Sequence, residues 1–390
     1  MWTERLRNCL AREALGRLHL PPWLFGHRYL RRREPSEFDC ELIDAATVSR
    51  VPLPSNVASR DQLPDDASLG PCSFRDVPER PVSETFFATI PRCRVLVGRD
   101  QWDNGFYAIV TENDEEVGVR GTQYIPAMHA PLMRRGAPRV HLQRATWILE
   151  QWDRNWGHWL QWHLVKIALL QKHGRGANIV IPERNRMSDA AEASLDALGF
   201  DRTTAHRLSS SVIEVDELTV VGMDAYRASL LDDLRNRLLV SPARRDRKLF
   251  ISRAKAARRR LRNEDECWSI FEAHGYESMV MDEHSFDAQR ALIGEAAVIA
   301  GLHGSGLVNV IFGAPGLEVI EIASGGFNPQ IYALCGALQH RYRVLFGTPV
   351  GEGNLNDQDV AVDAGELRDV VERVDVTLRH PERSEGSPAA

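Results

Sequence analysis

The sequence lacks any uncharged apolar run of about 18 residues, the length that a transmembrane helix requires, so no membrane span is expected. Its N-terminus is charged every few residues and has no apolar stretch typical of a signal peptide. The six cysteines include no Cys-x-x-Cys pair, which excludes a zinc ribbon and a thioredoxin-like redox motif. We therefore expect reduced, mostly buried thiols in a cytoplasmic protein.

An excess of basic charge is also lacking, because Lys and Arg number 48 against 54 Asp and Glu, for a net charge of −6. A dedicated nucleic-acid-binding protein would carry a basic excess over at least one domain, so no nucleic-acid partner is expected. What is present is an ordinary globular composition, 43% hydrophobic and 26% charged, over 390 residues. That length indicates two or three domains.

Changes in the residue pattern along the chain suggest four segments. Residues 1–80 are expected to form a basic helix followed by an extended loop. Residues 81–241 and 242–350 each mix strands and helices and are expected to be two α/β domains. Residues 351–390 are expected to hold a last helix and a disordered tail.

The N-terminal residues 1–33 are strongly basic, with eight Arg against two Glu. An amphipathic helix lying on the anionic cytoplasmic face of a membrane is one interpretation. A surface helix packed on the domain behind it is the other, and the narrow apolar stripe favours it. Any membrane contact is thus expected to be peripheral at most.

The second half of the chain alternates strands and helices more cleanly than the first half. Residues 83–111 suggest short strands, residues 145–150 a helix and residues 156–172 a longer helix. Beyond Pro242, strand and helix patterns follow one another up to about residue 348. This alternation predicts βαβ units and a doubly wound parallel sheet.

Three predicted strands of this second half end in residues suited to a nucleotide. In open parallel sheets, ligands bind where strands end at their carboxyl side. A helix that starts at a glycine-rich turn presents free N–H groups to an anion, a guanidinium binds phosphate oxygens in bidentate fashion, and a carboxylate accepts ribose hydroxyls. The residues expected to bind in this way are Arg253, His303, Gly304, Ser305, Gly306, Asn309 and Glu321.

Other site types do not fit the sequence. There is no P-loop motif, and Ser305 is not a nucleophile elbow, because His and Leu stand where glycines are needed. His158 and His163, five residues apart, are expected on different helix faces, so no metal site is predicted. The basic run 244–262 is expected to form a solvated face around Arg253 that attracts an anionic substrate.

A second distinctive stretch is NWGHWL at residues 155–160. Asn155 is a predicted N-cap, which puts His158 in the first helical turn. The positive helix end disfavours an imidazolium, so His158 would be neutral and able to act as a base. Trp152, Trp156 and Trp159 recur at helical spacing, a pattern that is more often core than a sugar-stacking surface.

These residues resemble a known family. HGSGLVNVIFGAPGLEVIEI resembles the His-Gly-[Ala/Ser]-Gly-Leu-x-Asn signature of family-61 glycosyltransferases with its later Pro-Gly and Glu, and NWGHWL and KLFISR are similar to further family motifs. The resemblance extends over about residues 80–348. It implies a GT-B architecture, with two Rossmann-like domains facing a cleft. It also implies inverting, metal-independent transfer of a hexose or pentose from a nucleotide sugar to a glycan hydroxyl, without a cofactor. In bacterial members the product is a capsular or other surface polysaccharide, and the acceptor can be lipid-linked.

The resemblance assigns roles to both halves of the chain. It implies that Arg253 and His303 act on the donor, with His303 contacting phosphate or sugar, and that His158 is the general base. The residues expected on the acceptor side are Asn155, Trp156, His158 and Trp159.

One position departs from the family pattern. Where the family commonly has a carboxylate four residues after the motif histidine, this chain has Trp162. His158 or Asp153 would then serve as base, or the protein would be an inactive scaffold that binds nucleotide sugars. An NAD(P)-dependent oxidoreductase is the other alternative, although the full Gly-x-Gly-x-x-Gly spacing is absent.

Overall fold

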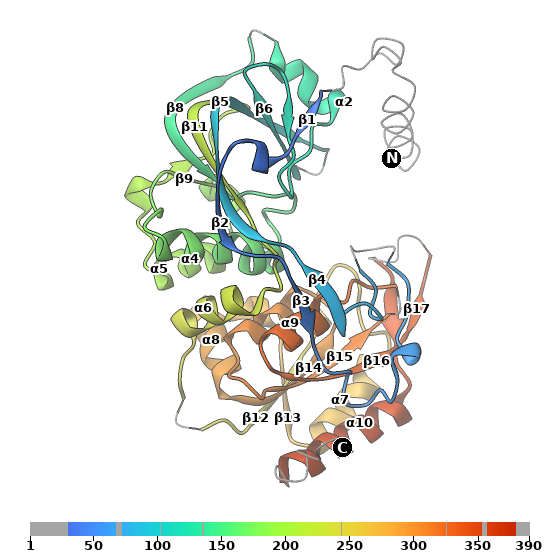
Figure 1. Ribbon diagram of the computed structural model, residues 1–390. Coiled ribbons are helices and arrows are strands. Elements are labelled where there is room, and N and C mark those ends of the chain that lie inside the picture. The colour runs from blue at the N-terminus through green and yellow to red at the C-terminus, as the bar shows by residue number, and fades with distance from the viewer. Residues whose placement is uncertain are drawn as a thin grey trace.

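The computed structural model shows a mixed α/β protein built on two sheets (Figure 1). The basic helix expected near the N-terminus and the C-terminal tail lie outside the residues that it describes. In this described part of the chain, no helix is both long and apolar enough to cross a membrane. The structure describes residues 30–379, apart from 68–71, 102, 135, 243, 325 and 353–356.

Within the described residues, the N-terminal sheet has nine strands, and their pairing is mixed. The long central strands pair antiparallel, whereas the strands on the other side of β11 run parallel. The strands in sheet order are β1 (Arg32–Arg33), β7 (Glu116–Val117), β6 (Gly105–Thr111), β5 (Thr85–Arg99), β11 (Val212–Gly222), β8 (Arg139–Trp147), β9 (Ile179–Ile181) and β10 (His206–Arg207), with β2 (Asp39–Asp44) on β5.

Two local predictions for this half were wrong. The helix expected near residues 145–150 is replaced by the end of strand β8, whose residues Ala145 to Trp147 are buried in the sheet. Instead of several short strands, β5 runs unbroken for 15 residues. In both cases pairing with β11 over a long register stabilises the extended chain more than local preference does.

Helices pack on this sheet and lead toward the second one (Figure 1). The predicted helix 156–172 is present, but a π-helical turn, η5 (Trp159–His163), interrupts it between α3 (Trp156–His158) and α4 (Leu164–Lys172). The further helices of this half are α2 (Pro126–His129), α5 (Asp189–Ala197) and α6 (Ala228–Leu238), with the short 3₁₀ segments η2 (Pro35–Glu37), η3 (Arg60–Gln62), η4 (Ala130–Met133), η6 (Arg184–Arg186) and η7 (Arg202–Thr204).

The C-terminal sheet confirms the parallel prediction. Its strands lie in the order β13, β12, β14, β15, β16, and every neighbouring pair is parallel. The strands are β12 (Arg247–Ile251), β13 (Tyr276–Met279), β14 (Ala296–Leu302), β15 (Glu318–Ala323) and β16 (Arg341–Phe346), connected or covered by α7 (Glu264–Ala273), η8 (Met281–Glu283), α8 (Phe286–Glu295), η9 (Ser305–Phe312), α9 (Gln330–Ala337) and α10 (Ala364–Arg379).

An N-terminal strap ties the first part of the chain to the C-terminal sheet. After β3 (Thr47–Arg50), residues 51–57 run along β16, which is the edge strand of that sheet. The N–H of Ser55 donates to the carbonyl of Tyr342 at 2.8 Å. The Asn56 amide donates to the carbonyl of Val344 at 2.8 Å and accepts from its N–H at 3.1 Å. The chain returns through β4 (Glu79–Val82), which pairs with β3, and a small hairpin, β17 (Thr348–Val350) with β18 (Asp359–Ala361), follows β16.

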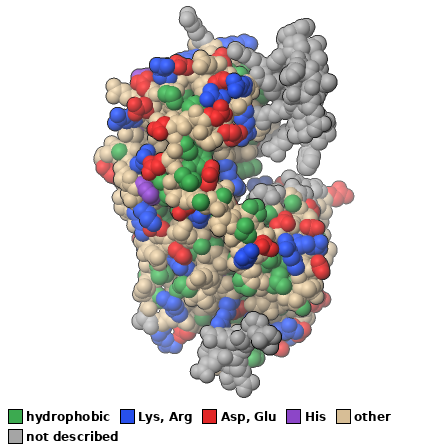
Figure 2. Space-filling view, in the orientation of Figure 1, with side chains coloured by type: hydrophobic (Ala, Val, Ile, Leu, Met, Phe, Trp, Pro, Cys, Tyr) green, Lys and Arg blue, Asp and Glu red, His purple; other side chains and the backbone are tan. Residues whose placement is uncertain are grey.

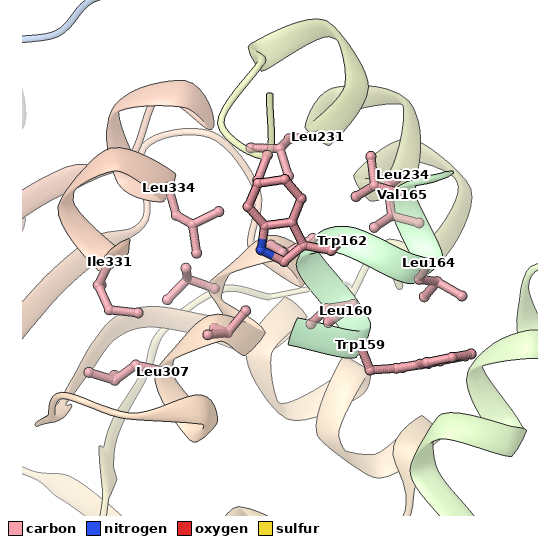
Figure 3. Packing of buried hydrophobic residues seen from close by; sticks show 14 of the residues in the cluster. Trp159, Leu160, Trp162, Leu164, Val165, Leu231, Leu234, Leu307, Ile331 and Leu334 are labelled. Atoms are coloured by element: carbon pink, nitrogen blue, oxygen red, sulfur yellow. The ribbon is translucent and has the colours of Figure 1, made fainter. Parts of the chain in front are cut away.

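The two sheets share one connected hydrophobic core. Figure 3 shows Trp162 and Leu160 beside Leu231 on one side and Leu307 and Leu334 on the other, all of them buried. These side chains come from η5, α6, η9 and α9, so the helical segment after His158 fills the space between the halves. On the face shown in Figure 2, acidic and basic side chains are intermixed.

Candidate functional site

The order of strands in the C-terminal sheet predicts a ligand site at the carboxyl ends of two neighbouring strands, β12 and β14. Numbered along the chain, the strands lie in the order 2-1-3-4-5, so the order reverses between β12 and β14. Ligands in such sheets bind at the carboxyl ends of the strands at this reversal. Ile251 pairs with Gly301 at these ends, and Arg253 and His303 each lie two residues beyond this pair. The sequence prediction and the topology therefore select the same two residues.

The guanidinium of Arg253 is fixed against the glycine-rich turn. Its Nε donates to the carbonyl of Arg259 at 2.9 Å, and Nη2 donates to that of Arg258 at 3.2 Å. Its Nη1 lies so close to Gly304 that a Cβ there would be 2.3 Å away. A side chain at residue 304 would therefore push the guanidinium off its two carbonyl anchors. A Cβ added at Gly306, two residues further along the chain, would lie 3.2 Å from Ile251 Cγ2.

Two arginines at the carboxyl ends of these strands, Arg253 and Arg259, have no carboxylate partner among the described residues. Burial lowers the pKa of Arg253, with the carboxylate of Asp282 opposing the shift. Burial, together with the positive charges of Arg253 and Arg258, lowers the pKa of Arg259 to about 10. Partly buried cations that repel one another gain most from a bound anion. The charge and burial of the pair therefore suit an anionic group such as a diphosphate.

Arg259 corrects the prediction for the basic run 244–262. Most Lys and Arg of the run are exposed, as predicted, but residues 252–260 form an irregular segment in which Arg259 is half-buried. Arg259 has a positive φ of 57°, and its guanidinium carbon lies 5.3 Å from the centroid of the Phe327 ring. Neither Arg259 nor Phe327 was predicted as a site residue. The density of arginines was the only sequence signal for Arg259, and Phe327 had none.

His303 is held by a buried carboxylate. Its Nδ1 lies 2.5 Å from Oε1 of Glu321, and its ring lies 5.1 Å from that of Phe327. Glu321 is fully buried, and its second oxygen accepts a hydrogen bond from the hydroxyl of Tyr342. The ribose-binding role expected for Glu321 does not fit this environment, because both oxygens are engaged inside the protein. Glu321 instead orients the imidazole, as carboxylates do behind functional histidines.

Asn309 connects the two halves and does not line the turn. It is fully buried; its Oδ1 accepts from Nε1 of Trp156 at 2.8 Å, and its amide donates to Oε1 of Gln289 at 3.0 Å. A direct donor contact does not fit, whereas support of the segment behind the turn does. Trp156, expected on the acceptor side, is half-buried and held by this bond and by the ring of Phe286 at 5.8 Å.

His158 lies where the helix cap was predicted. Oδ1 of Asn155 accepts from the N–H of His158 at 3.2 Å, which confirms the N-cap. Burial lowers the pKa of His158, and the charge of Arg120 lowers it further against the opposing effect of Glu150. Nδ1 of His158 is buried and has no partner in the described part of the chain. The ring is thus a neutral imidazole, a form that can accept a proton.

Gly157 brings this histidine next to the glycine-rich turn. A Cβ at residue 157 would lie 3.2 Å from Val308 Cγ2 and 3.5 Å from Ser305 Cβ. Gly157 therefore leaves no room for a substrate beside it, because protein atoms occupy that space. The contact instead joins α3, which carries His158, to η9, which begins with the half-exposed Ser305.

Two other residues of the NWGHWL region belong to the core. Trp159 is buried, and its Nε1 donates to the hydroxyl of Ser194 at 2.9 Å, so it does not fit an acceptor surface. Asp153, the alternative base, is buried and accepts hydrogen bonds from Tyr107 at 2.9 Å and Arg186 at 3.1 Å. Each oxygen of this carboxylate thus already has a partner inside the protein.

The π-helical turn η5 runs from Trp159 to His163 and directly follows His158. Burial, together with the charge of Lys166, lowers the pKa of His163. His163 is fully buried, and its Nε2 accepts from the N–H of Glu150 at 3.1 Å. Such π-turns inside helices are frequent at functional sites. Among the described residues, no group of three His, Cys, Asp or Glu is arranged to hold a metal ion.

Comparison with known proteins adds one relationship. The family model described as Glycosyltransferase 61 matches residues 156–320. This range begins one residue after the N-cap of α3 and ends one residue before Glu321, so it includes His158, Arg253 and the turn after β14. No curated protein matches the chain.

Proposed function

Residues 156–320 belong to the glycosyltransferase 61 family, and from this premise we propose that the protein is an inverting glycosyltransferase that needs no metal ion. It moves a hexose or pentose from a nucleotide-sugar donor to a glycan hydroxyl. The observation that carries the proposal is the pair Arg253 and Arg259, two half-buried guanidiniums without a carboxylate partner in the described residues, beside the turn at Gly304.

On the donor side, the two arginines and the turn bind the diphosphate. As the bond between the anomeric carbon and the phosphate oxygen breaks, the nucleoside diphosphate leaves with the electron pair. Fixed positive charges at that oxygen stabilise the transition state more than the ground state. They supply the charge that a divalent cation supplies in metal-dependent transferases. His303, oriented by Glu321, offers its Nε2 to the donor phosphate or sugar.

On the acceptor side, His158 is the general base. Its buried environment keeps the imidazole neutral, so it can take the proton from the attacking hydroxyl. The hydroxyl oxygen then forms the new bond on the face of the sugar opposite the departing phosphate, which inverts the anomeric configuration. The close packing of α3 against η9 at Gly157, where an added Cβ would lie 3.5 Å from Ser305 Cβ, supports a shared site for His158 and the turn.

The same proposal extends to the architecture and to the biological setting. A GT-B arrangement, with the donor held by the parallel sheet and the acceptor near α3, agrees with the reversal of strand order at β12 and β14. We place the reaction in the cytoplasm, on a free or lipid-linked glycan that becomes a surface or capsular polysaccharide.

Calorimetric titration of the full-length protein with a panel of sugar nucleotides, NAD and NADP, with EDTA present, tests this function. Tight binding of one sugar nucleotide, reduced in Arg253→Ala but kept in the exposed-neighbour control Arg260→Ala, is the expected result. Binding of the dinucleotides alone would identify an oxidoreductase instead. Donor binding without product, assayed against glycan acceptors, would indicate an inactive scaffold.

A further inference from the structure

An arginine outside the donor site lies next to the proposed base. Arg120 is exposed in the turn after β7, and its guanidinium carbon is 4.0 Å from the centroid of the Trp162 ring. The N–H and hydroxyl of Thr122 both bond the carbonyl of Val119, which fixes the turn. Gly121 has a φ of +79°, and a Cβ there would lie 2.4 Å from Cγ of Glu150. The position of Arg120 is thus set by the fold.

The positive charge of Arg120 is not neutralised within the described residues. Glu150, against which the turn packs, already pairs with Lys166 at 2.6 Å. Asp224 forms a bidentate pair with Arg80 at 2.7 and 2.9 Å. Although burial alone would raise the pKa of Asp224, the bond and charge of Arg80, with a smaller contribution from Arg120, lower it. Both carboxylates are therefore already paired with another cation, and Arg120 is the surplus cation.

The neighbouring titratable rings do not supply a counter-charge either. Burial raises the pKa of the Tyr226 hydroxyl to about 12, so that group is neutral. Burial keeps His158 neutral as well. An exposed guanidinium that stacks on an aromatic ring keeps the N–H groups at its rim free to donate hydrogen bonds to an oxyanion.

Trp162 contributes a second donor at the same place. Its side chain is only 6% exposed, and its indole N–H has no hydrogen-bond partner in the part of the chain that the structure describes. The ring lies on the π-helical turn that directly follows His158. The Arg120 guanidinium and the indole on which it stacks thus lie one helical turn from the base.

We propose that Arg120 and Trp162 bind an anionic group, a carboxylate or a phosphate ester, on the acceptor glycan. This inference rests on the proposed function, because it takes the side of His158 as the acceptor side. A uronic acid and a phosphorylated or lipid-diphosphate-linked sugar share the required chemistry. Charge-assisted hydrogen bonds to such a group hold the neighbouring hydroxyl near His158.

The indole N–H of Trp162 gives a local signal for the test. We would label the tryptophans of the full-length protein with ¹⁵N, identify the Trp162 signal by its loss in Trp162→Phe, and titrate four probes. Methyl glucuronide, glucose 6-phosphate and inorganic phosphate carry the anion, and methyl glucoside is the neutral control. The first two distinguish the carboxylate from the phosphate source.

The expected result is a saturable shift of this signal with one or more anionic probes and none with methyl glucoside. Arg120→Met should weaken anion binding about ten- to a hundredfold, as expected for loss of hydrogen bonds from a charged group. Arg120→Lys should weaken it less. Arg175→Met is the matched control, because Arg175 also stacks on an aromatic ring, that of Phe87 at 5.0 Å, but is paired with Glu41.

Two outcomes would overturn the inference: equal binding of methyl glucoside and the anionic probes to the wild type, or undiminished anion binding to Arg120→Met. The wild-type comparison decides the matter even if a variant fails to fold. Calorimetry with sugar nucleotides on the same samples separates this inference from the function itself. Lost donor binding with an intact Arg120-dependent shift would refute only the proposed function, and the reverse pattern would refute only the acceptor anion site.

Discussion

The indole N–H of Trp156 donates to Oδ1 of Asn309 over 2.8 Å, joining residues 153 positions apart in the sequence. One belongs to α3, next to His158, and the other to η9, just behind the glycine-rich turn. Asn309 is fully buried, and its amide is used by Gln289, so each of its polar ends has one partner. This bond fixes the distance between the two halves of the candidate site.

Removing the indole N–H should therefore destabilise the protein. Trp156→Phe leaves Oδ1 of Asn309 buried without a partner, which we expect to cost about 1–3 kcal/mol of unfolding free energy. Urea denaturation measures the loss, with Trp152→Phe as control, because Trp152 is 42% exposed. In Trp156→Phe/Asn309→Leu the two losses should not add. Full additivity would mean that the bond does not couple the halves.

The arginine pair gives a prediction about affinity. Arg253→Ala and Arg259→Ala should each weaken binding of the nucleoside diphosphate part of the donor about tenfold or more, because each removes a charged phosphate ligand. Arg260→Ala should bind the donor as the wild type does, since the Arg260 side chain is exposed. The bond of Arg260 to Asp359 is made by its backbone N–H, which the substitution keeps. Calorimetry at low salt measures all three. Equal affinities across the set would remove the anion site from the mechanism.

A methyl group at the turn should act through Arg253. In Gly304→Ala the new Cβ would lie 2.3 Å from Nη1 of Arg253, so the guanidinium must leave its two carbonyl anchors. We expect reduced donor affinity with little change in melting temperature. Gly306→Ala, with its nearest contact at 3.2 Å to Ile251, should have the smaller effect on affinity. The opposite order would show that Arg253 is not held as described.

The lowered pKa of His158 predicts where enzymatic activity falls on the acidic side of the pH profile. Because burial lowers its pKa, the neutral base persists at pH values below the ordinary histidine value of about 6.5. Activity, measured as kcat/KM, should thus fall only below about pH 6.5. His158→Gln should abolish turnover while donor binding persists. A limb centred above that value, or an active His158→Gln variant, would move the general base elsewhere.

The lowered pKa of His340 predicts that the folded protein loses stability in acid. Burial lowers its pKa from 6.5 to about 4, although its Nε2 bonds the carbonyl of Val310 at 2.9 Å. The unfolded chain therefore binds a proton first as the pH falls, and stability is lost between pH 6.5 and 4. The loss attributable to His340 is roughly 3 kcal/mol at the lower limit.

Urea denaturation at a series of pH values checks this. His340→Gln should flatten the decline, whereas His141→Gln should not, because His141 is exposed on the sheet. An unchanged slope in His340→Gln would assign the acid sensitivity to other groups, with His163 next.

The parallel sheet was predictable because each of its elements is short and locally encoded. Ser285, for example, caps α8 between β13 and β14 through a local bond, in which its side chain accepts from the N–H of Ala288. The strand near Trp147 was not predictable, since its pairing with β11 depends on residues some 70 positions away. Long-range pairing of that kind leaves little trace in local pattern.

For the candidate site, residue type and strand ends predicted Arg253 and the turn at Gly304, which the structure places side by side. The sequence did not indicate that Glu321 and Asn309 are fully buried and hydrogen-bonded within the protein, because burial and hydrogen-bond partners depend on the folded chain. Arg259 and Arg120 were missed for a related reason. An arginine in a basic run or a turn differs from its neighbours only in the charges that surround it after folding.

The strap of residues 51–57 has a consequence for the order of events during synthesis. Asn56 emerges from the ribosome 288 residues before its partner Val344. At bacterial-type elongation rates this interval is roughly 15–60 s. Throughout it, the strap is an unpaired segment of nascent chain, and once translated the outer edge of β16 is open to foreign strands until the strap docks. Completion of the C-terminal sheet thus waits for both the strap and β16, so a fragment that lacks residues 51–57 should leave the outer edge of β16 uncovered.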